Sequence, residues 1–271
     1  MSASEEISVI LPVYNGEATL DLAIRSILEQ RDADLRLYIC DDASIDATGE
    51  RIRQWAAQDK RIVSLRNEKN ARSSGARNRC LALAKGKYIA LMDADDYSHP
   101  ERLKTQAAFL ESEPKLSFVG TRGRFFRRDP DDLTEDYWFV RKPEPKDFLM
   151  TLPFVHASLM FRREDLEAIG GYDAGKWAQR SEDYELLMRL YADGCLGENI
   201  DQPLYYIRMD EETQRRRKYR YRLNECLVKW RGFSRMGLMP RGVPYALKPL
   251  AVGLIPKNAL ERMKRSFYQD R

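Results

Sequence analysis

Short apolar runs alternate with helical segments over the first 98 residues, and this alternation constrains the fold more than any other feature. The runs that we expect to be strands are residues 7–13, 35–40, 61–65 and 87–92. The segments that we expect to be helices between them are residues 17–30, 44–57 and 73–84. Strand–helix units with short connections are typical of a doubly wound, mostly parallel α/β sheet. Neither a Gly-x-Gly-x-x-Gly motif nor a phosphate-binding loop follows the first run, which argues against a dinucleotide cofactor.

Acidic side chains follow two of these expected strands at their carboxyl ends. Asp41 and Asp42 follow the second run, and Asp93, Asp95 and Asp96 follow the fourth. Ligands of open α/β sheets bind beyond the carboxyl ends of the strands. Crowded carboxylates repel one another unless a cation joins them, and hard divalent cations prefer oxygen ligands. The pattern therefore fits a divalent cation site, and an acidic turn before the next helix explains it equally well.

The regular alternation ends after residue 98. We expect a helix at residues 101–111, a strand at 116–121, a strand at 155–161 that carries His156 and Ser158, and a strand at 203–208. We also expect a helix at residues 163–169 that stops at Gly170 and Gly171, and a further helix that Ser181 caps.

The chain becomes basic after residue 213, and we expect two amphipathic helices there, at residues 215–236 and 245–267. Basic helices with Trp230 and Phe233 on them suit the surface of an anionic membrane. A helical lid on the sheet or a dimer contact fits the same pattern, so the oligomeric state stays open. The formal net charge of +4 comes without a recognition motif, so we expect no nucleic-acid partner.

The cysteines and the first residues bear on the compartment. Four cysteines are scattered without a Cys-x-x-Cys pair, which indicates reduced thiols. The first six residues are polar and acidic, unlike a secretory signal, and no apolar run reaches the ~18 residues that span a bilayer. We expect a cytoplasmic protein.

Five sequence blocks occur in the order and spacing of a known family. They are ISVILPVYNG at residues 7–16, DDASID at 41–46, the stretch from Asn70 through ARN to GKYI at 70–89, DADD at 93–96, and the stretch from MFRR through GGYD to SEDYEL at 160–186. With these blocks the chain resembles the inverting nucleotide-sugar glycosyltransferases of family 2, which have the GT-A fold. The similarity covers roughly residues 5–208. It implies a GT-A domain at 1–210, with a donor half at about 1–98 and an acceptor half at about 99–210, followed by a basic helical segment at 211–271.

The resemblance implies that the first turn binds the nucleotide base. Pro12, Tyr14, Asn15 and Glu17 match the wall of the base pocket, where an aromatic face can stack on a pyrimidine. Asp42 matches the acid that accepts a hydrogen bond from the base. Without the resemblance, Tyr14 is an ordinary turn residue and Asp42 belongs to a turn before a helix.

The resemblance also implies roles around the sugar diphosphate. Arg72 or Arg77 would reach the base or the diphosphate, Asp93 would hold the ribose hydroxyls, and Asp95 would bind Mg²⁺ or Mn²⁺, which bridges the phosphates. Asp96 would support this site from behind. On helix geometry alone, either arginine fits a solvated face.

Asp183 matches the general base of an inverting transfer, in which one carboxylate removes the proton from the attacking hydroxyl. Glu182 and Asp183 stand at an expected helix start, whose dipole favours the ionised form and also explains the two acids without catalysis. His156 contacts the acceptor or diphosphate, or it is simply packed. Many relatives carry a histidine, a candidate metal ligand, at the position of Asp210. The resemblance leaves two alternatives: Asp210 substitutes as an oxygen ligand, or the ion is held only by Asp95, phosphates and water.

The resemblance implies transfer of a hexosyl group, with a UDP-sugar as the favoured donor, to a hydroxyl of a glycan or lipid-linked acceptor in polysaccharide synthesis. We expect this at the inner face of the cell membrane. A sugar-phosphate nucleotidyltransferase is one alternative, but residues 11–16 lack its Gly-rich basic loop. A non-catalytic nucleotide-sugar sensor is the other, and it would not need Asp183.

Overall fold

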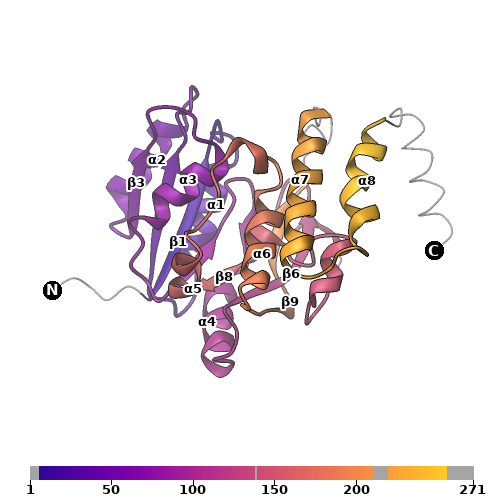
Figure 1. Ribbon diagram of the computed structural model, residues 1–271. Coiled ribbons are helices and arrows are strands. Elements are labelled where there is room, and N and C mark those ends of the chain that lie inside the picture. Colours follow the sequence, from indigo (N-terminus) through magenta and orange to yellow (C-terminus); the bar gives the residue numbers. More distant parts are fainter. Residues whose placement is uncertain (1–5, 138, 210–218, 255–271) are drawn as a thin grey trace.

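The computed structural model describes residues 6–137, 139–209 and 219–254 (Figure 1). Its strands form one nine-stranded sheet in the order β3-β2-β1-β4-β8-β6-β9-β5, with β7 paired to β6. The strands are β1 (Ile7–Val13), β2 (Leu35–Asp41), β3 (Ile62–Arg66), β4 (Tyr88–Leu91), β5 (Tyr97–Ser98), β6 (Phe118–Phe126), β7 (Leu133–Asp136), β8 (Met160–Arg162) and β9 (Gly197–Arg208). The α-helices are α1 (Leu20–Leu28), α2 (Thr48–Gln58), α3 (Arg72–Leu81), α4 (Arg102–Ser112), α5 (Arg163–Ala168), α6 (Glu182–Ala192), α7 (Tyr219–Arg235) and α8 (Val243–Leu254). Three short 3₁₀ helices are η1 (Pro145–Leu149), η2 (His156–Ser158) and η3 (Lys176–Ala178).

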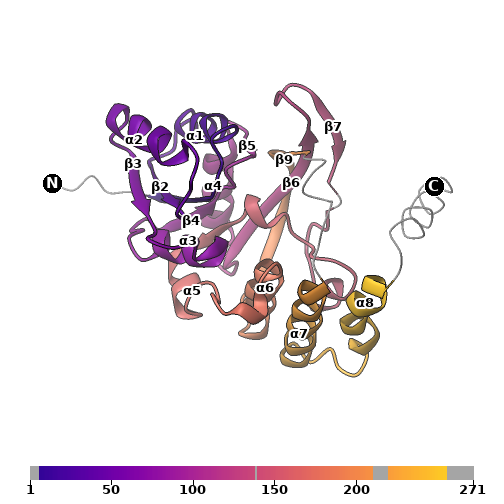
Figure 2. The ribbon, with the colours of Figure 1, turned by 90° about the horizontal axis from the view of Figure 1, so that it is seen from above.

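The first half of the sheet confirms the doubly wound prediction. Strands β3, β2, β1 and β4 are parallel neighbours, and helices α1 and α2 lie on one face while α3 lies on the other (Figure 2). The register pairs Val13 with Asp41 and Ile10 with Leu91. Strands β1, β2 and β4 therefore end close together, and the turns after them meet at one edge of the sheet.

The second half makes the sheet mixed. Strand β8 runs antiparallel to both β4 and β6, whereas β6 and the long strand β9 are parallel. The expected strand at 116–121 continues to Phe126, and the expected strand at 203–208 begins at Gly197. The sheet is still mostly parallel around the first turns, as predicted for a GT-A fold.

The expected strand at residues 155–161 is wrong for its first half. Residues His156–Ser158 form η2, and only Met160–Arg162 form β8. The reason is local hydrogen bonding, since both the amide and the hydroxyl of Ser158 bind the carbonyl oxygen of Val155, at 2.9 and 2.8 Å. A serine hydroxyl that binds nearby backbone competes with a sheet ladder.

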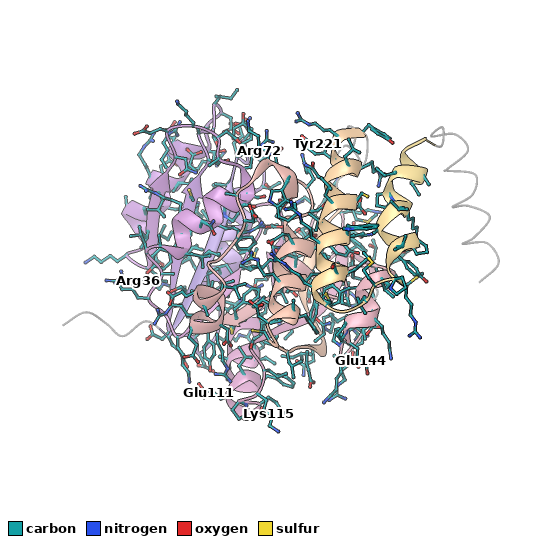
Figure 3. The ribbon with its side chains drawn as sticks, viewed as in Figure 1. Arg36, Arg72, Glu111, Lys115, Glu144 and Tyr221 are labelled. Carbon is teal, nitrogen blue, oxygen red and sulfur yellow. The ribbon has the colours of Figure 1, made fainter. Side chains whose placement is uncertain are left out.

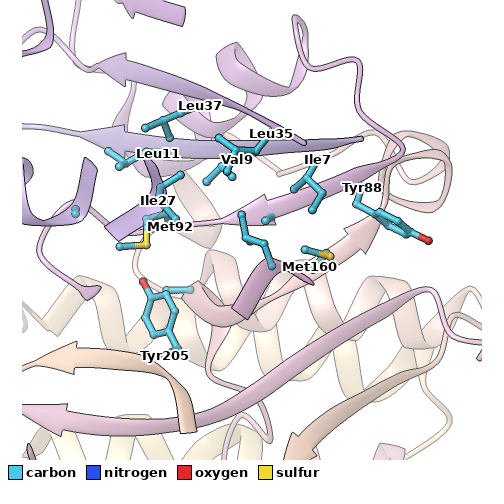
Figure 4. Packing of buried hydrophobic residues seen from close by; sticks show 14 of the residues in the cluster. Ile7, Val9, Leu11, Ile27, Leu35, Leu37, Tyr88, Met92, Met160 and Tyr205 are labelled. Carbon is cyan, nitrogen blue, oxygen red and sulfur yellow. The ribbon is translucent and has the colours of Figure 1, made fainter. Parts of the chain in front are cut away.

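Alternate side chains of the strands pack on opposite faces of the sheet, so the core has two layers. Ile7, Val9 and Leu11 of β1 point to one face and pack with Leu37 of β2 and Ile27 of α1 (Figure 4). Ile10, which lies between Val9 and Leu11 on β1, packs on the other face in a cluster with Ala76 and Cys80 of α3. All four cysteines are free thiols, which confirms that prediction.

The basic helices α7 and α8 pack against the rest of the protein. Gly232 of α7 lies so close to α6 that an added Cβ would be 2.3 Å from the sulfur of Met188. Phe233 and Val228 of α7 are buried with the α6 side chains. In the described part of the chain, no helix has the length and apolar character needed to cross a membrane. The end of the expected helix at 245–267 lies outside the described residues, and the division at residue 210 stays a prediction.

Candidate active site

The turn after β1 is tied to the loop after β2 by hydrogen bonds. Asn15 adopts a left-handed conformation (φ 52°), which asparagine tolerates better than most residues. Its amide donates to the Ser44 hydroxyl at 2.9 Å, and its side-chain oxygen accepts from the amide of Ile45 at 3.0 Å. The Glu17 carboxylate accepts from another amide of the same loop at 2.8 Å. These side chains hold the turn in place, and the Tyr14 ring, 49% exposed, is left facing outward.

The two acids after β2 are buried and bind protein groups. Asp41 pairs with Arg66 and accepts a hydrogen bond from the Ser44 amide at 2.8 Å, and at the start of α2 the Asp46 carboxylate accepts from the Thr48 amide at 3.0 Å. One carboxylate oxygen of Asp42 accepts from the Asn67 side chain at 2.8 Å and from the Ala71 amide at 2.7 Å. Asp42 thereby fixes the loop that leads to α3 at the edge of the sheet.

Arg77 of α3 pairs with a carboxylate just beyond the end of β4. Its buried guanidinium donates to Asp93 at 2.7 Å and lies over the Tyr172 ring, 5.4 Å from the centroid. Burial by itself lowers the pKa of Arg77, but the charges of Asp93 and Glu182 outweigh it, and the pKa lies above its ordinary value. The arginine is therefore a permanent cation that is paired with Asp93 and also attracted by the charge of Glu182.

The acids after β4 repel one another. Asp96 is buried, and its burial together with the charges of Asp95 and Asp93 raises its pKa well above the ordinary value. Asp96 accepts a hydrogen bond from the Arg208 amide at 2.9 Å, whereas the Asp95 side chain is exposed. A cation beside Asp95 would relieve this repulsion.

The acidic side chains after β4 fit a metal site in which the substrate supplies some of the ligands. Among the described residues no three side chains of the ligand types are grouped to hold a metal ion. Mg²⁺ is usually bound by one or two carboxylates together with substrate phosphates, so Asp95 alone suits such a site. Asp210, the second candidate ligand, lies outside the described residues.

Asp183 lies in the first turn of α6 with a raised pKa. Ser181 occupies the N-cap position but makes no capping side-chain hydrogen bond, contrary to expectation. The Asp183 carboxylate instead accepts from the Tyr184 amide at 2.8 Å. Burial, followed by the charge of Glu182, raises the pKa of Asp183 to about 6. At neutral pH it is a carboxylate with more affinity for a proton than an ordinary aspartate, which suits a general base.

His156 and Tyr172 lie close together near Arg77. His156 Nε2 lies 3.0 Å from the Tyr172 hydroxyl, so the histidine has a protein partner. Burial and the nearby Arg77 charge lower the pKa of His156 well below its usual value, and the ring is neutral at pH 7. Tyr172 belongs to the GGYD block, whose glycines were expected only to end a helix. Tyr172 was not singled out from the sequence, although the GGYD block that contains it could have indicated it.

One cavity of about 700 Å³ brings several expected residues together. Asp93, Arg77 and Asp183 line it, together with Asp96, His156 and Glu182. The lining does not include Pro12, Tyr14, Asn15, Glu17, Asp42, Arg72 or Asp95, which lie at or near the carboxyl ends of the strands. Helices α7 and α8 supply lining residues that sequence reasoning missed, namely Arg222, Glu225, Lys229, Lys248, Pro249 and Val252.

Comparison with known proteins decides the family. The family described as Glycosyl transferase family 2 matches residues 8–170, which is more than half of the chain. The chain belongs to this glycosyltransferase family. The putative glycosyltransferase EpsE of Bacillus subtilis is 34% identical over 97% of this chain and 94% of its own length. A UDP-Glc:α-D-GlcNAc-diphosphoundecaprenol β-1,3-glucosyltransferase of Escherichia coli, WfaP, is 37% identical over 40% of this chain and 43% of its own length.

Solved structures of other glycosyltransferases share the fold. TarS of S. aureus with UDP-GlcNAc superposes with a TM-score of 0.70 at 18% identity, over 90% of this chain and 73% of TarS. The mannosyltransferase PcManGT of Pyrobaculum calidifontis, with GDP-Man and Mn²⁺, gives a TM-score of 0.62 at 20% identity, over 98% and 81% of the chains. This family 2 glycosyltransferase therefore has the architecture expected from its sequence.

Proposed function

We propose that this glycosyltransferase transfers a hexosyl group from a UDP-sugar to a hydroxyl of a glycan or lipid-linked acceptor, with inversion at the anomeric carbon. The observation that carries the proposal is the cavity in which Asp183, with its pKa of about 6, shares a wall with the Arg77–Asp93 pair. The names of two relatives support the substrates, since TarS was solved with UDP-GlcNAc and WfaP is named as a UDP-Glc-dependent glucosyltransferase. Residues 1–98 serve the donor and residues 99–210 the acceptor in this proposal.

The donor binds across the turns at the sheet edge. Tyr14 stacks on the uracil ring, supported by Pro12 and by the loop that Asn15 and Glu17 hold. Asp42 accepts a hydrogen bond from the base. Asp93 accepts from the ribose hydroxyls while it stays paired with Arg77.

The reaction needs a proton acceptor and a stabilised leaving group. Asp183 takes the proton from the acceptor hydroxyl as that oxygen attacks the sugar from the face opposite the diphosphate. Arg77, with Arg72 at the start of α3, offsets the charge that grows on the departing diphosphate. Mg²⁺ or Mn²⁺ held by Asp95, with Asp96 behind it, supplies further charge neutralisation when bound.

Thermal stabilisation by a panel of nucleotide sugars tests the donor. We expect a UDP-sugar, added with Mn²⁺ at a concentration of about 100 times its Kd, to raise the melting temperature by about 5 °C. Binding at that concentration adds about 2.7 kcal/mol to the free energy of unfolding. GDP- and ADP-sugars serve as controls with the same diphosphate and a different base. A larger shift with one of them would contradict the choice of uridine, and no shift with any of them would contradict donor binding altogether.

We also propose that α7 rests on an anionic membrane, at the cytoplasmic face where lipid-linked acceptors would be reached. Tyr219, Leu223, Leu227 and Trp230 form one exposed stripe on α7, each between 45% and 49% exposed. Exposed arginines lie beside this stripe on the same helix, at positions 220, 231 and 235. An apolar stripe flanked by arginines is typical of helices that lie in the interface of anionic lipids.

Vesicle flotation tests the membrane surface. We expect the triple variant L223S/L227S/W230S to bind anionic phosphatidylglycerol vesicles at least about tenfold more weakly, because three apolar side chains no longer enter the interface. The matched control is L83S/L196S, which changes two leucines of similar exposure away from α7. Equal binding of the triple variant and the wild type would rule out this surface.

A further inference from the structure

The cavity has a basic wall that the transfer reaction described above does not use. Arg222, Lys229 and Lys248 of α7 and α8 line it on the side away from the sheet edge. Residues 222, 225 and 229 lie on one face of α7 because they are three and four positions apart. These residues come from the segment that follows the acceptor half of the chain.

Two of these cations share a single carboxylate inside the protein. Glu225 lies 3.5 Å from Arg222 and 3.2 Å from Lys229. The side chains of Lys229 and Glu225 are only 6% and 16% exposed. Within residues 6–137, 139–209 and 219–254, Glu225 is the carboxylate that pairs with these two cations. An excess positive charge in such a protected place is costly unless an anion compensates it.

The basic wall adjoins the proposed base. The Lys229 ammonium lies over the Tyr184 ring, 5.0 Å from its centroid, and Tyr184 follows Asp183 in α6. On the other side of Asp183, its neighbour Glu182 is bound by the Ser73 hydroxyl of α3, the helix that carries Arg77. Asp183 therefore stands between the donor side of the cavity and the basic wall.

The rim of the cavity adds more positive charge. Arg180 lines the cavity and is exposed just before α6. The pKa of Tyr221 on α7 is lowered, first by its hydrogen bond with Arg220 and further by the charges of Arg72 and Arg180. In Figure 3, Arg72 and Tyr221 lie at the same edge of the molecule, and Lys115 lies at the opposite edge. A negatively charged molecule that approaches this edge would be attracted toward the basic wall.

We propose that the wall formed by Arg222, Lys229 and Lys248 binds a phosphate group on the acceptor, so that the substrate is a phosphate-bearing sugar. This inference rests on the proposed function. A hydroxyl of the acceptor sugar then lies at Asp183, while its phosphate lies on the far side from the donor. A neutral acceptor binds more weakly, because it leaves Arg222 and Lys229 with Glu225 as their shared carboxylate and brings no second anion.

Phosphorus-31 NMR titration of glucose 1-phosphate into the full chain, saturated with UDP, tests this subsite. UDP fills the donor side, so binding then reports the acceptor side. We expect wild type to bind glucose 1-phosphate. Methyl glucoside, its neutral match, has no phosphorus, so its affinity is measured by competition against glucose 1-phosphate and should be at least about fivefold weaker. Lys248→Gln and Arg222→Gln should each weaken the binding of glucose 1-phosphate about 3- to 5-fold. Lys115→Gln, which changes an exposed lysine at the opposite edge, should leave it unchanged.

Glu225→Gln gives the opposite result if the inference is right. It removes the carboxylate that competes for the two cations, so glucose 1-phosphate should bind about threefold more tightly. A purely structural role of this cluster predicts no gain.

Three outcomes would overturn the inference: no binding by the UDP-saturated wild type, displacement of glucose 1-phosphate by UDP, or equal affinities of Lys248→Gln and Lys115→Gln. Displacement would assign the phosphate to the donor side. If UDP itself fails to bind, the proposed function fails instead. Failure of the phosphate subsite and failure of the proposed function are therefore distinguishable.

Discussion

The variant Asp183→Asn is expected to lose about 10³-fold in kcat, because general base catalysis contributes roughly 10²- to 10⁴-fold and asparagine cannot accept the proton. Binding of the nucleotide sugar should stay within about twofold of wild type, since the role proposed for Asp183 is to act on the acceptor. The measurement is steady-state transfer with a saturating donor, together with calorimetric titration of UDP. A nucleotide-sugar sensor would be indifferent to the change.

The pH profile provides an independent check of the same residue. The pKa of Asp183 is raised to about 6, and the base is active only when deprotonated. The logarithm of kcat/KM should therefore rise with slope one below pH 6 and level off above it. In Asp183→Asn this rise should disappear from the residual rate.

Asp193→Asn is the matched control for both experiments. Asp193 stands at the opposite end of α6 and is exposed. The substitution also converts an aspartate of α6 to asparagine, but outside the cavity. Wild-type rates and an unchanged profile are expected, and an equal loss in Asp193→Asn would mean that the helix rather than the base was damaged.

The second large effect is expected from removing the metal ligand. Asp95→Asn should lower kcat/KM at least about 100-fold at low Mn²⁺, because a metal that neutralises a leaving diphosphate contributes several kcal/mol. Treatment of wild type with a chelator should give a similar loss. In calorimetry, UDP should bind wild type more tightly with Mn²⁺ than without, and this difference should shrink in the variant.

The control for this experiment is Asp34→Asn, an exposed aspartate before β2, at the other end of the strands. It should behave as wild type at every Mn²⁺ concentration. Transfer that is unaffected by the chelator would contradict a metal-assisted reaction. Retention of the Mn²⁺ effect in Asp95→Asn would move the ion to another ligand.

Local patterns predicted the parallel half of the fold because the information is contained in short segments. The apolar runs at residues 7–13 and 35–40 are buried on both faces of a sheet, and such strands are readable without their partners. The turn chemistry at Asn15 and the acids at the strand ends were visible for the same reason. Five blocks in order identified the family, and comparison confirmed it.

Errors arose where local and tertiary hydrogen bonds compete. The run at 155–161 is apolar enough for a strand, but Ser158 turns it into η2. Ser181 has the chemistry of a helix cap, yet its side chain makes no capping hydrogen bond at the start of α6. Nothing within either segment distinguishes these outcomes.

The sequence by itself determined the parallel sheet, the acidic strand ends and the family of this glycosyltransferase, since each depends on residues that are close along the chain. Only the tertiary structure decided that Arg77 pairs with Asp93, and that Arg222 and Lys229 of α7 line the same cavity as Asp183. It also decided the raised pKa of Asp183, which depends on burial by distant segments. Charge and burial act through space, and sequence spacing carries no record of which segments will enclose a side chain.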